Sequence, residues 1–529
     1  MRMREWIIRR WIFLRFLLTL IPLIPSHSMA ESFSLFNPAT PFICPDTDPQ
    51  CSGLFLTHQQ DGSQMGLIMS GEMSLAVRLE TLRNARKSIL IQSLIFAGDE
   101  SGLRIAEVLK QKKAQGVDVR IIIDALSNSP PQTQQLYFDL SEHDIPVLGY
   151  EPGMFTLATE FEHPSEREEN PHESCRIDKR LHEKMWIVDG NTDEAVAVTG
   201  GLNIANEYFR LGSQPKVRWR DQDCILKGSI VSDLYTSFMR NFEYLMKIKE
   251  KRPDLFRIEY VQSRASRIFA CLFARCGAQD ENGHLILRYS KNKMTMALID
   301  EIEKTSKKPT FSDRGKLRFF QSRPRAGESY IHQVYRKMIQ EAKEEILIAN
   351  AYFLPDQALL HDLSNAAKRG VQIKLLTNSK KSTDMEIMTL GTRYTYLPLM
   401  VFDRFANRTA MSARDHFKKD EPLGSIKIYE WVGPKIGEGT LHAKFAVFDR
   451  RAGIIGSYNL DLRSKNLNSE TALVFEDDQQ ANQLAEYFIQ EDLPKSQEIT
   501  LDQAIKYHQP KDPFTEFGLA LSEIFAQEL

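Results

Sequence analysis

Two histidine–lysine pairs are the residues of this sequence best suited to chemistry. In the stretch LHAKFAVFD, His442 and Lys444 alternate and Asp449 follows. If residues 441–448 form a strand, the alternation of side chains directs His442 and Lys444 to the same face. A neutral imidazole beside an ammonium group suits in-line displacement at phosphorus, because one supplies a nucleophile and the other holds the non-bridging oxygens. We therefore interpret this stretch as a half-site for phosphoryl chemistry.

The same arrangement occurs a second time, upstream. LHEKMWIVD gives His182, Lys184 and Asp189 the same spacing, H-x-K-x4-D. A single pair of this kind is more often a packed pair at a sheet edge, by roughly ten to one. Two copies with matched spacing reverse those odds. If the copies meet across a pseudo-two-fold axis, one cleft receives both histidines and both lysines.

A glycine turn follows each copy and carries polar side chains. The downstream copy continues into Gly-Ser-x-Asn, which contains Ser457 and Asn459, and the upstream copy into Gly-Gly-x-Asn, which contains Asn203. Neutral donors at these positions would bind the same phosphate oxygens as the lysines. We expect all three side chains to contact phosphate.

The paired motifs resemble the HKD motifs of the phospholipase D superfamily. The resemblance implies a two-step reaction, in which one histidine attacks phosphorus and forms a phosphohistidine. The other histidine protonates the leaving alkoxide and then takes a proton from the incoming alcohol or water. The scheme implies no metal and no cofactor, since Lys184 and Lys444 supply the positive charge.

In this superfamily an acidic residue downstream of each motif orients the histidine through its other ring nitrogen. Glu470 matches that position in the second copy, so we expect it to orient His442. In the first copy Asp221 is the best match, ahead of Asp223 and Glu207.

The aspartate of each motif ends its predicted strand. Asp189 and Asp449 belong to the motif and so to the candidate catalytic set, but we expect them to fix loop geometry rather than to react. The first copy also contains extra residues, GNTDE, between Asp189 and its glycine pair. We interpret this insertion as a longer hairpin loop.

Other segments are similar to bacterial cardiolipin synthases, and the similarity extends from about residue 73 to 493. GSYNLDLRSKNLNSE, GGLNIANEYF, ANAYFLPD and KKSTD carry it. The similarity implies phosphatidyl transfer between phospholipid headgroups, or hydrolysis when water intercepts the intermediate. Phospholipid and a membrane surface are the partners that it implies. The alternative is an endonuclease of the same superfamily, acting on DNA, but the two motifs in one chain and the formal charge of −2 favour lipid.

The elements that must position these residues also occur twice. Residues 74–85 and 329–342 have helical periodicity, and each is followed by a β-rich run, a second helix and a second buried strand. This order predicts an α/β fold of two duplicated halves, each a mixed, mostly parallel sheet flanked by helices. We predict an irregular lead-in at 31–72, a first half at 73–248, a connecting region at 249–325 and a second half at 326–529.

The N-terminus predicts export. Residues 1–30 contain a basic stretch, a short apolar run and a final Ser-Met-Ala, which is typical of a cleaved signal peptide. An uncleaved anchor in the inner membrane is the alternative. We expect an exported protein, periplasmic or secreted, that is peripheral to the membrane. The apolar segment 385–413 forms either a hydrophobic lip of the cleft or core helices, with near-even odds.

Overall fold

A computed structural model describes residues 32–36, 63–124, 126–128, 130–150, 180–212, 218–251, 291–324, 328–417, 424–433 and 439–509. Residues 1–30, predicted to be a signal peptide or anchor, lie outside these ranges. In the described part, no helix has both the length and the apolar composition needed to cross a bilayer. Residues 34–529 form one compact unit.

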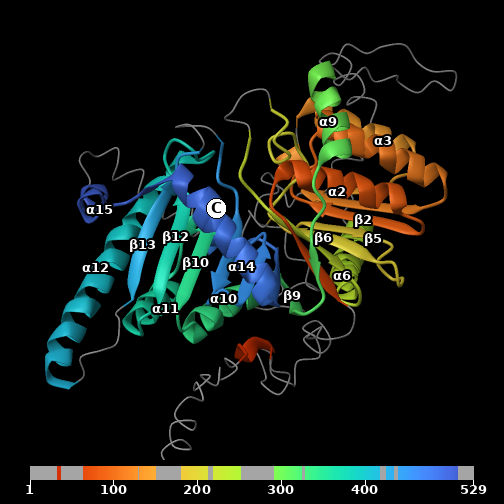
Figure 1. Cartoon of the computed structure of the whole chain (residues 1–529). Helices are drawn as coiled ribbons and strands as arrows, with labels where there is room; N and C mark the ends of the chain where they lie inside the picture. The colour runs from red at the N-terminus through yellow and green to blue at the C-terminus, as the bar shows by residue number, and fades with distance from the viewer. Residues whose placement is uncertain are drawn as a thin grey trace, which may run out of the picture. The chain divides into compact units, whose positions relative to one another are not determined.

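Two eight-stranded sheets form the framework of this unit (Figure 1). The first has the order β4 (Val147–Tyr150), β3 (Asp118–Asp124), β2 (Ser88–Ser93), β5 (Met185–Val188), β6 (Val196–Gly200), β7 (Asp223–Lys227), β1 (Gln64–Ile68) and β8 (Phe311–Ser312). The second has the order β18 (Ser496–Glu498), β13 (Ser425–Trp431), β12 (Gln372–Asn378), β10 (Glu345–Asn350), β14 (Lys444–Phe448), β15 (Ala452–Gly456), β17 (Glu470–Glu476) and β9 (Lys316–Ser322).

The two sheets repeat one topology, which confirms the predicted duplication. β4-β3-β2-β5-β6-β7-β1 corresponds strand for strand to β13-β12-β10-β14-β15-β17-β9. The sheets are mixed, as predicted, but the expectation that they are mostly parallel is wrong. In each sheet two neighbouring pairs are parallel, β2–β3 and β3–β4 or β10–β12 and β12–β13, and the other described pairs are antiparallel. The helical crossovers that require parallel pairing occur before the motif strands, and hairpins follow them.

Helices cover these sheets and bury their apolar faces. Those of the first half are α2 (Gly71–Asn84), α3 (Glu100–Ala114), α4 (Pro131–Glu142), α6 (Val231–Lys251) and α9 (Lys293–Thr305). Those of the second are α10 (Tyr330–Glu341), α11 (Gln357–Lys368), α12 (Glu386–Phe417), α13 (Leu462–Asn466), α14 (Asp478–Tyr487) and α15 (Leu501–His508). Asp99 and Asp356 cap α3 and α11 equivalently, each accepting a backbone N–H three residues on.

One hydrophobic core joins the two halves. It contains Ile187 of β5, Phe238 of α6, Phe445 of β14, Phe475 of β17 and Leu484 of α14. A second core lies between the first sheet and α2, α3 and α4. Of these helices, α2 and α3 lie side by side in Figure 1. Since alternate residues of β5 enter different cores, the whole strand is apolar. β5 is therefore fixed from both faces, and every residue of β14 is likewise buried.

The predicted domain boundaries need two corrections. Residues 31–72 are not wholly irregular, because β1 pairs with β7 along its length inside the first sheet. The predicted connecting region contains α9, which packs on α2, and β9, which pairs with β17 in the second sheet. The first half therefore begins before β1, and the second half includes β9. β1 and β9 each pair with a strand of their own sheet that is distant in the sequence, β7 and β17, and local periodicity does not reveal such pairing.

The apolar segment near residues 385–413 lies in one long helix, α12, with Pro398 inside it. The helix packs against α11, α15 and β13. Met385 and Val401 remain 41% and 47% exposed. The segment therefore contains both packed and exposed apolar residues, and neither of the two predicted roles, hydrophobic lip or core helix, describes all of it.

Candidate active site

The two motif histidines lie just before their strands rather than within them. β5 begins at Met185 and β14 at Lys444, so the predicted strand over 441–448 begins later than expected. Each extended segment pairs instead with the other half of the chain. The His182 N–H donates to the Ser469 carbonyl at 3.0 Å, and the His442 N–H donates to the Arg220 carbonyl at 2.8 Å. The first bond places His182 beside Glu470, which follows Ser469. The second places His442 beside Asp221, which follows Arg220.

This exchange crosses the histidine–acid pairs. His182 Nδ1 lies 2.8 Å from Glu470 Oε2, and His442 Nδ1 lies 2.6 Å from Asp221 Oδ2. The two acids are the ones predicted, but their assignment within each half is wrong. Glu470 orients His182, and Asp221 orients His442, because the backbone pairing joins each motif segment to the acid-bearing segment of the opposite half. Asp223, the neighbouring alternative, instead binds Arg78 at 2.7 Å.

Glu470 is held by several donors besides His182. Ser457 Oγ donates to it at 2.5 Å, Ser464 Oγ at 2.9 Å and Asn468 Nδ2 at 3.3 Å. Burial alone would raise the pKa of Glu470, but His182 and Lys184 together with the hydroxyl of Ser457 hold it below its usual value. We predicted that Ser457 contacts phosphate. In the structure its hydroxyl donates instead to Glu470, the acid that orients His182.

Asp221 has a poorer set of donors. Besides His442 it accepts the N–H of Gln222 at 2.9 Å. Gly201 occupies the position equivalent to Ser457, and a Cβ there would lie 2.1 Å from Asp221 Oδ1. The missing side chain makes room for the carboxylate but leaves it without a hydroxyl partner. Burial raises the pKa of Asp221 to about 6, against the charge of Lys444.

The two lysines complete the cluster. Lys184 Nζ donates to the His182 carbonyl at 2.7 Å, and Lys444 Nζ donates to the His442 carbonyl at 2.5 Å. Burial lowers the pKa of Lys184 to about 7 and that of Lys444 to about 8, although Glu470 and Asp221 oppose the effect. Burial and the lysine charges also lower the pKa of His182 to about 4 and that of His442 well below 6.5. Both imidazoles are therefore neutral at physiological pH, as a nucleophile or proton acceptor must be.

The aspartates of the motifs are structural, as expected of their strand-end positions. Asp189 and Asp449 adopt φ of 53° and 52° at the turn that follows each motif strand. Their carboxylates accept three successive backbone N–H groups each, those of Arg86, Lys87 and Ser88 and of Lys343, Glu344 and Glu345, at 2.7–3.2 Å. These bonds fix the entry to β2 and β10. The structure thus removes Asp189 and Asp449 from the candidate catalytic set.

The turn asparagines differ in their environment. Asn203 Nδ2 donates to Tyr208 Oη at 2.8 Å, and the Asn203 side-chain oxygen accepts from Ile95 N–H at 3.3 Å. It therefore positions Tyr208, whose ring packs edge-on against His442 at 5.1 Å between centroids, rather than being directed at phosphate. Asn459 is buried, and its side-chain oxygen has no hydrogen-bond partner among the described residues. Of the three predicted phosphate contacts, Asn459 remains a candidate.

Three supporting residues escaped the sequence analysis. Asn378 brackets the residue before His442, donating to the Leu441 carbonyl at 2.6 Å and accepting the Leu441 N–H at 3.0 Å. Arg220 forms a buried bidentate pair with Asp492, at 2.7 and 2.8 Å. This pair fixes the segment that presents Asp221. Neither feature has a local sequence signature, because the partners are 63 and 272 positions apart.

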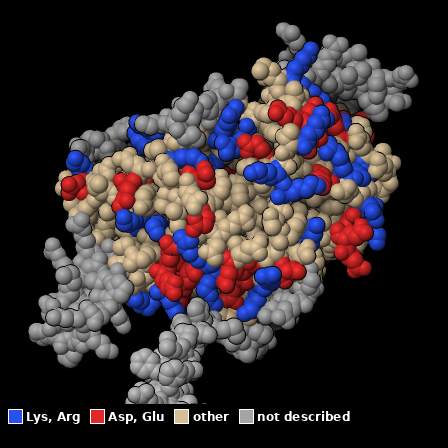
Figure 2. Space-filling model, in the orientation of Figure 1, with Lys and Arg blue, Asp and Glu red and all other residues tan. Residues whose placement is uncertain are grey.

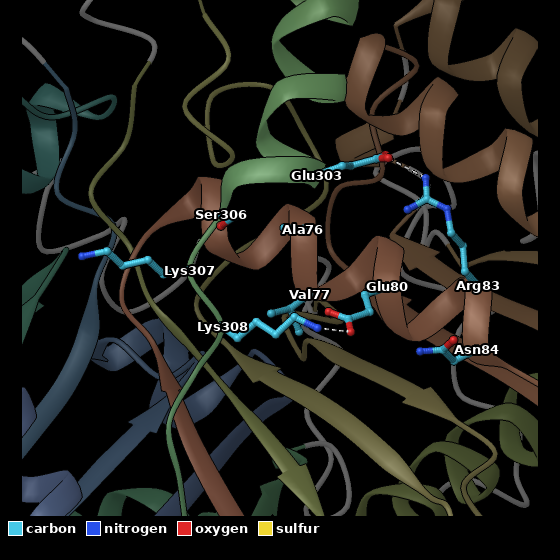
Figure 3. Close-up of a pocket in the computed structure, with 9 residues that line it drawn as sticks. All are labelled: Ala76, Val77, Glu80, Arg83, Asn84, Glu303, Ser306, Lys307 and Lys308. Atoms are coloured by element: carbon cyan, nitrogen blue, oxygen red, sulfur yellow. Dashed lines mark hydrogen bonds and ion pairs between the residues drawn. The ribbon is translucent and has the colours of Figure 1, made fainter.

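A polar recess of about 280 Å³ lies between α2 and the end of α9, apart from the residues of the cluster (Figure 3). Two of its three cations are already paired, Lys308 with Glu80 and Arg83 with Glu303, each at 2.6 Å. The third, Lys307, points away from these two pairs in Figure 3. Nine residues line it: Ala76, Val77, Glu80, Arg83, Asn84, Glu303, Ser306, Lys307 and Lys308.

The chain is similar to known proteins over most of its length. The family model described as "Cardiolipin synthase, PLD-like domain" matches residues 79–252 and 335–492, more than half of the chain. Cardiolipin synthase B of Salmonella typhimurium (strain LT2) is 25% identical over 419 residues, which cover 79% of this chain and 78% of that protein. Cardiolipin synthase 2 of Bacillus anthracis is 25% identical over 436 residues, which cover 82% of this chain but 65% of that protein.

An uncharacterised protein of Helicobacter pylori (strain 26695) is also 25% identical, over 424 residues that cover 78% of this chain and 75% of that one. Among solved structures, phosphatidylserine synthase of Haemophilus influenzae Rd KW20 has a TM-score of 0.55 at 14% identity and covers 90% of this chain and 97% of that one. The structural likeness supports the duplicated fold.

Proposed function

Because the chain belongs to the phospholipase D superfamily, in its cardiolipin synthase-like branch, we propose that it transfers phosphatidyl groups between phospholipid headgroups through a phosphohistidine. Its relatives support a phosphatidyltransferase in general terms. The crossed pairs of histidine and acid carry the proposal. They put two imidazoles, each oriented by a carboxylate, beside two lysines in one buried cluster.

The chemistry needs two half-reactions. In the first, Nε2 of one neutral histidine attacks phosphorus and a P–N bond forms. The P–O bond to the headgroup alcohol breaks as the other histidine, which takes up a proton on Nε2 when the anionic phosphodiester binds, delivers that proton to the leaving oxygen and becomes neutral again. In the second, the other histidine takes the proton of an incoming alcohol, whose oxygen forms a new P–O bond as the P–N bond breaks. The acids hold each Nδ1–H, so Nε2 is left to react. Lys184 and Lys444 stabilise the charge on the non-bridging oxygens.

Hydrolysis is the second candidate, because water competes with the alcohol in the second half-reaction. The nuclease alternative has less support. On the face drawn in Figure 2, Lys and Arg are interspersed with Asp and Glu, and the described residues of that face form no continuous basic strip. Binding of a nucleic acid backbone favours such a strip. The phosphodiester of a phospholipid presents a single charge, which the buried lysines alone can neutralise.

Export is part of the proposal and rests on the sequence of residues 1–30. We infer that this segment directs the chain across the inner membrane and that the mature protein acts at a membrane surface. Mass spectrometry of the mature N-terminus and fractionation of the producing cells would test it. A chain that keeps residues 1–30 and stays with the inner membrane would instead favour an anchor.

The decisive experiment is a metal-free assay of the purified protein on phosphatidylglycerol vesicles, with products resolved by mass. Cardiolipin with released glycerol is expected, and phosphatidic acid alone would reassign the protein as a phospholipase. His182→Ala and His442→Ala should each abolish turnover, since each half-reaction needs both imidazoles. Full activity of either variant would refute the shared site, and cleavage of DNA in place of lipid would favour the nuclease.

A further inference from the structure

A tyrosine–aspartate pair lies beside His442 and has no part in the two half-reactions described above. Tyr352 Oη donates to Asp384 Oδ1 at 2.5 Å. Tyr352 is half-buried in the loop after β10, and Asp384 is exposed in the turn between β12 and α12. Oδ2 of Asp384 has no partner among the described residues, so the carboxylate retains accepting capacity towards solvent or a ligand.

Tyr352 is anchored directly to the second motif segment. The Ala351 N–H donates to the Ala443 carbonyl at 3.0 Å. Ala443 separates His442 from Lys444, so Tyr352 follows a residue hydrogen-bonded to the centre of the motif. The backbone that carries Tyr352 is therefore held to the second motif segment, and the bond to Asp384 orients the phenol.

Asp384 is anchored to the same segment through Asn378. Ser382 Oγ donates to Asn378 Oδ1 at 3.0 Å, and the same side chain brackets the backbone of Leu441. The turn that carries Asp384 is thus held next to the residue before His442. Consistent with this, the charge of Asp384 acts on His442, where it opposes the lowering of the pKa by burial and by the lysines.

The chemistry of this pair excludes the phosphate as its ligand. A carboxylate repels the phosphodiester, which the lysines attract, but it accepts hydrogen bonds strongly from hydroxyl groups. The phenol oxygen of Tyr352 can accept as well, since its own proton is committed to Asp384. A carboxylate fixed beside a proton-transferring histidine suits the alcohol that leaves or enters at phosphorus.

We propose that Tyr352 and Asp384 form an alcohol subsite beside His442 that binds the free hydroxyl groups of a polyol headgroup. The inference rests on the proposed phosphatidyl transfer and names the acceptor class. In this subsite one hydroxyl of the polyol gives its proton to His442 and attacks phosphorus, so the P–N bond breaks as the P–O bond forms. A second hydroxyl of the same polyol donates to Asp384 and holds the attacking oxygen in place.

The test is a competition between soluble acceptors on phosphatidylglycerol vesicles. Glycerol and 1-propanol have the same carbon chain, but only glycerol keeps free hydroxyls after transfer. The wild type should prefer glycerol, and Asp384→Asn should lower the ratio of phosphatidylglycerol formed from labelled glycerol to phosphatidylpropanol about tenfold, through loss of a charged acceptor. Tyr352→Phe should lower the ratio less. Glu386→Gln is the matched control, because Glu386 is an exposed carboxylate of the same region that pairs only loosely with Lys380, at 3.6 Å.

The outcomes separate this inference from the proposed function. An unchanged acceptor ratio in Asp384→Asn, at an unchanged melting temperature, would overturn the subsite. A larger loss of ethanolamine transfer than of glycerol transfer would also overturn it, because the carboxylate would then recognise an ammonium group. If the wild type forms neither a phosphatidyl alcohol nor phosphatidic acid, the proposed function itself fails.

Discussion

Replacing Asp221 with asparagine tests the crossed pairing and the electrostatics of the cluster together. The carboxylate of Asp221 holds His442 Nδ1 at 2.6 Å. A hydrogen bond to a charged group contributes about 1.5–3 kcal/mol, and about 1.36 kcal/mol corresponds to a tenfold change in rate. If asparagine keeps the shape but not the charge, kcat should fall about 10- to 150-fold.

The pH profile gives a sharper result than the rate. Burial raises the pKa of Asp221 to about 6, and the charged carboxylate is the form that orients His442. Wild-type activity should therefore fall as the pH decreases through about 6, because the carboxyl then takes up a proton. Asp221→Asn cannot titrate, so its residual activity should stay flat in this range. Protonation of His182, whose pKa is about 4, should affect both proteins only at lower pH.

The assay is kcat against pH from 4.5 to 7.5, on phospholipid vesicles, with Asp223→Asn as the control. Asp223 is the buried neighbour that binds Arg78 instead of a histidine, so its variant should lose stability but keep the fall in activity near pH 6. An unchanged fall near pH 6 in Asp221→Asn would refute the reasoning. Nitrogen NMR of protein labelled at histidine tests the crossed pairing separately. Glu470→Gln should shift the Nδ1 signal of His182. A shift of the His442 signal alone would show instead that each acid orients the histidine of its own half.

Three further predictions concern the lysines and the supporting framework. As the pH rises through about 7 to 8, kcat/KM should fall because Lys184 and Lys444 lose their charge; a profile that is flat to pH 9 would contradict the buried cluster. Asp449→Asn should lower the free energy of unfolding by about 1–3 kcal/mol, through loss of its hold on backbone N–H groups, while activity per folded molecule stays near wild type; a specific loss of kcat would return Asp449 to the catalytic set. Asp492→Ala should cost about 3–5 kcal/mol by leaving the Arg220 guanidinium buried without its partner, measured by denaturant unfolding, and a change below about 1 kcal/mol would show that water reaches Arg220.

The sequence predicted the parts of the site that repeat. The spacing of His182 and Lys184 recurs in His442 and Lys444, and the helix–strand order before each motif recurs with it, so duplication could be recognised without a structure. The orienting acids, Asp221 and Glu470, were identified from the superfamily resemblance, although each was assigned to the wrong histidine. In the structure they occupy equivalent register positions, two residues before the partners of Gly200 and Gly456.

What the sequence could not predict depends on contacts between distant segments. The pairing of β1 with β7 spans more than 150 positions, and the crossing of the acids depends on backbone bonds between the halves. The role of Ser457 was misassigned for the same reason. A hydroxyl after a glycine fits a phosphate site and a carboxylate site equally well, and only the position of Glu470 distinguishes them.

The crossing makes each catalytic unit a composite of both halves. An extended segment before a strand has unpaired backbone groups, and burial requires partners for them. Here the segment before β5 pairs with the one before β17, and the segment before β14 pairs with the one before β7. Each pairing delivers one acid to the opposite histidine. Neither half alone therefore contains a histidine with its orienting acid. The backbone hydrogen bonds that join the two halves also fix the catalytic geometry.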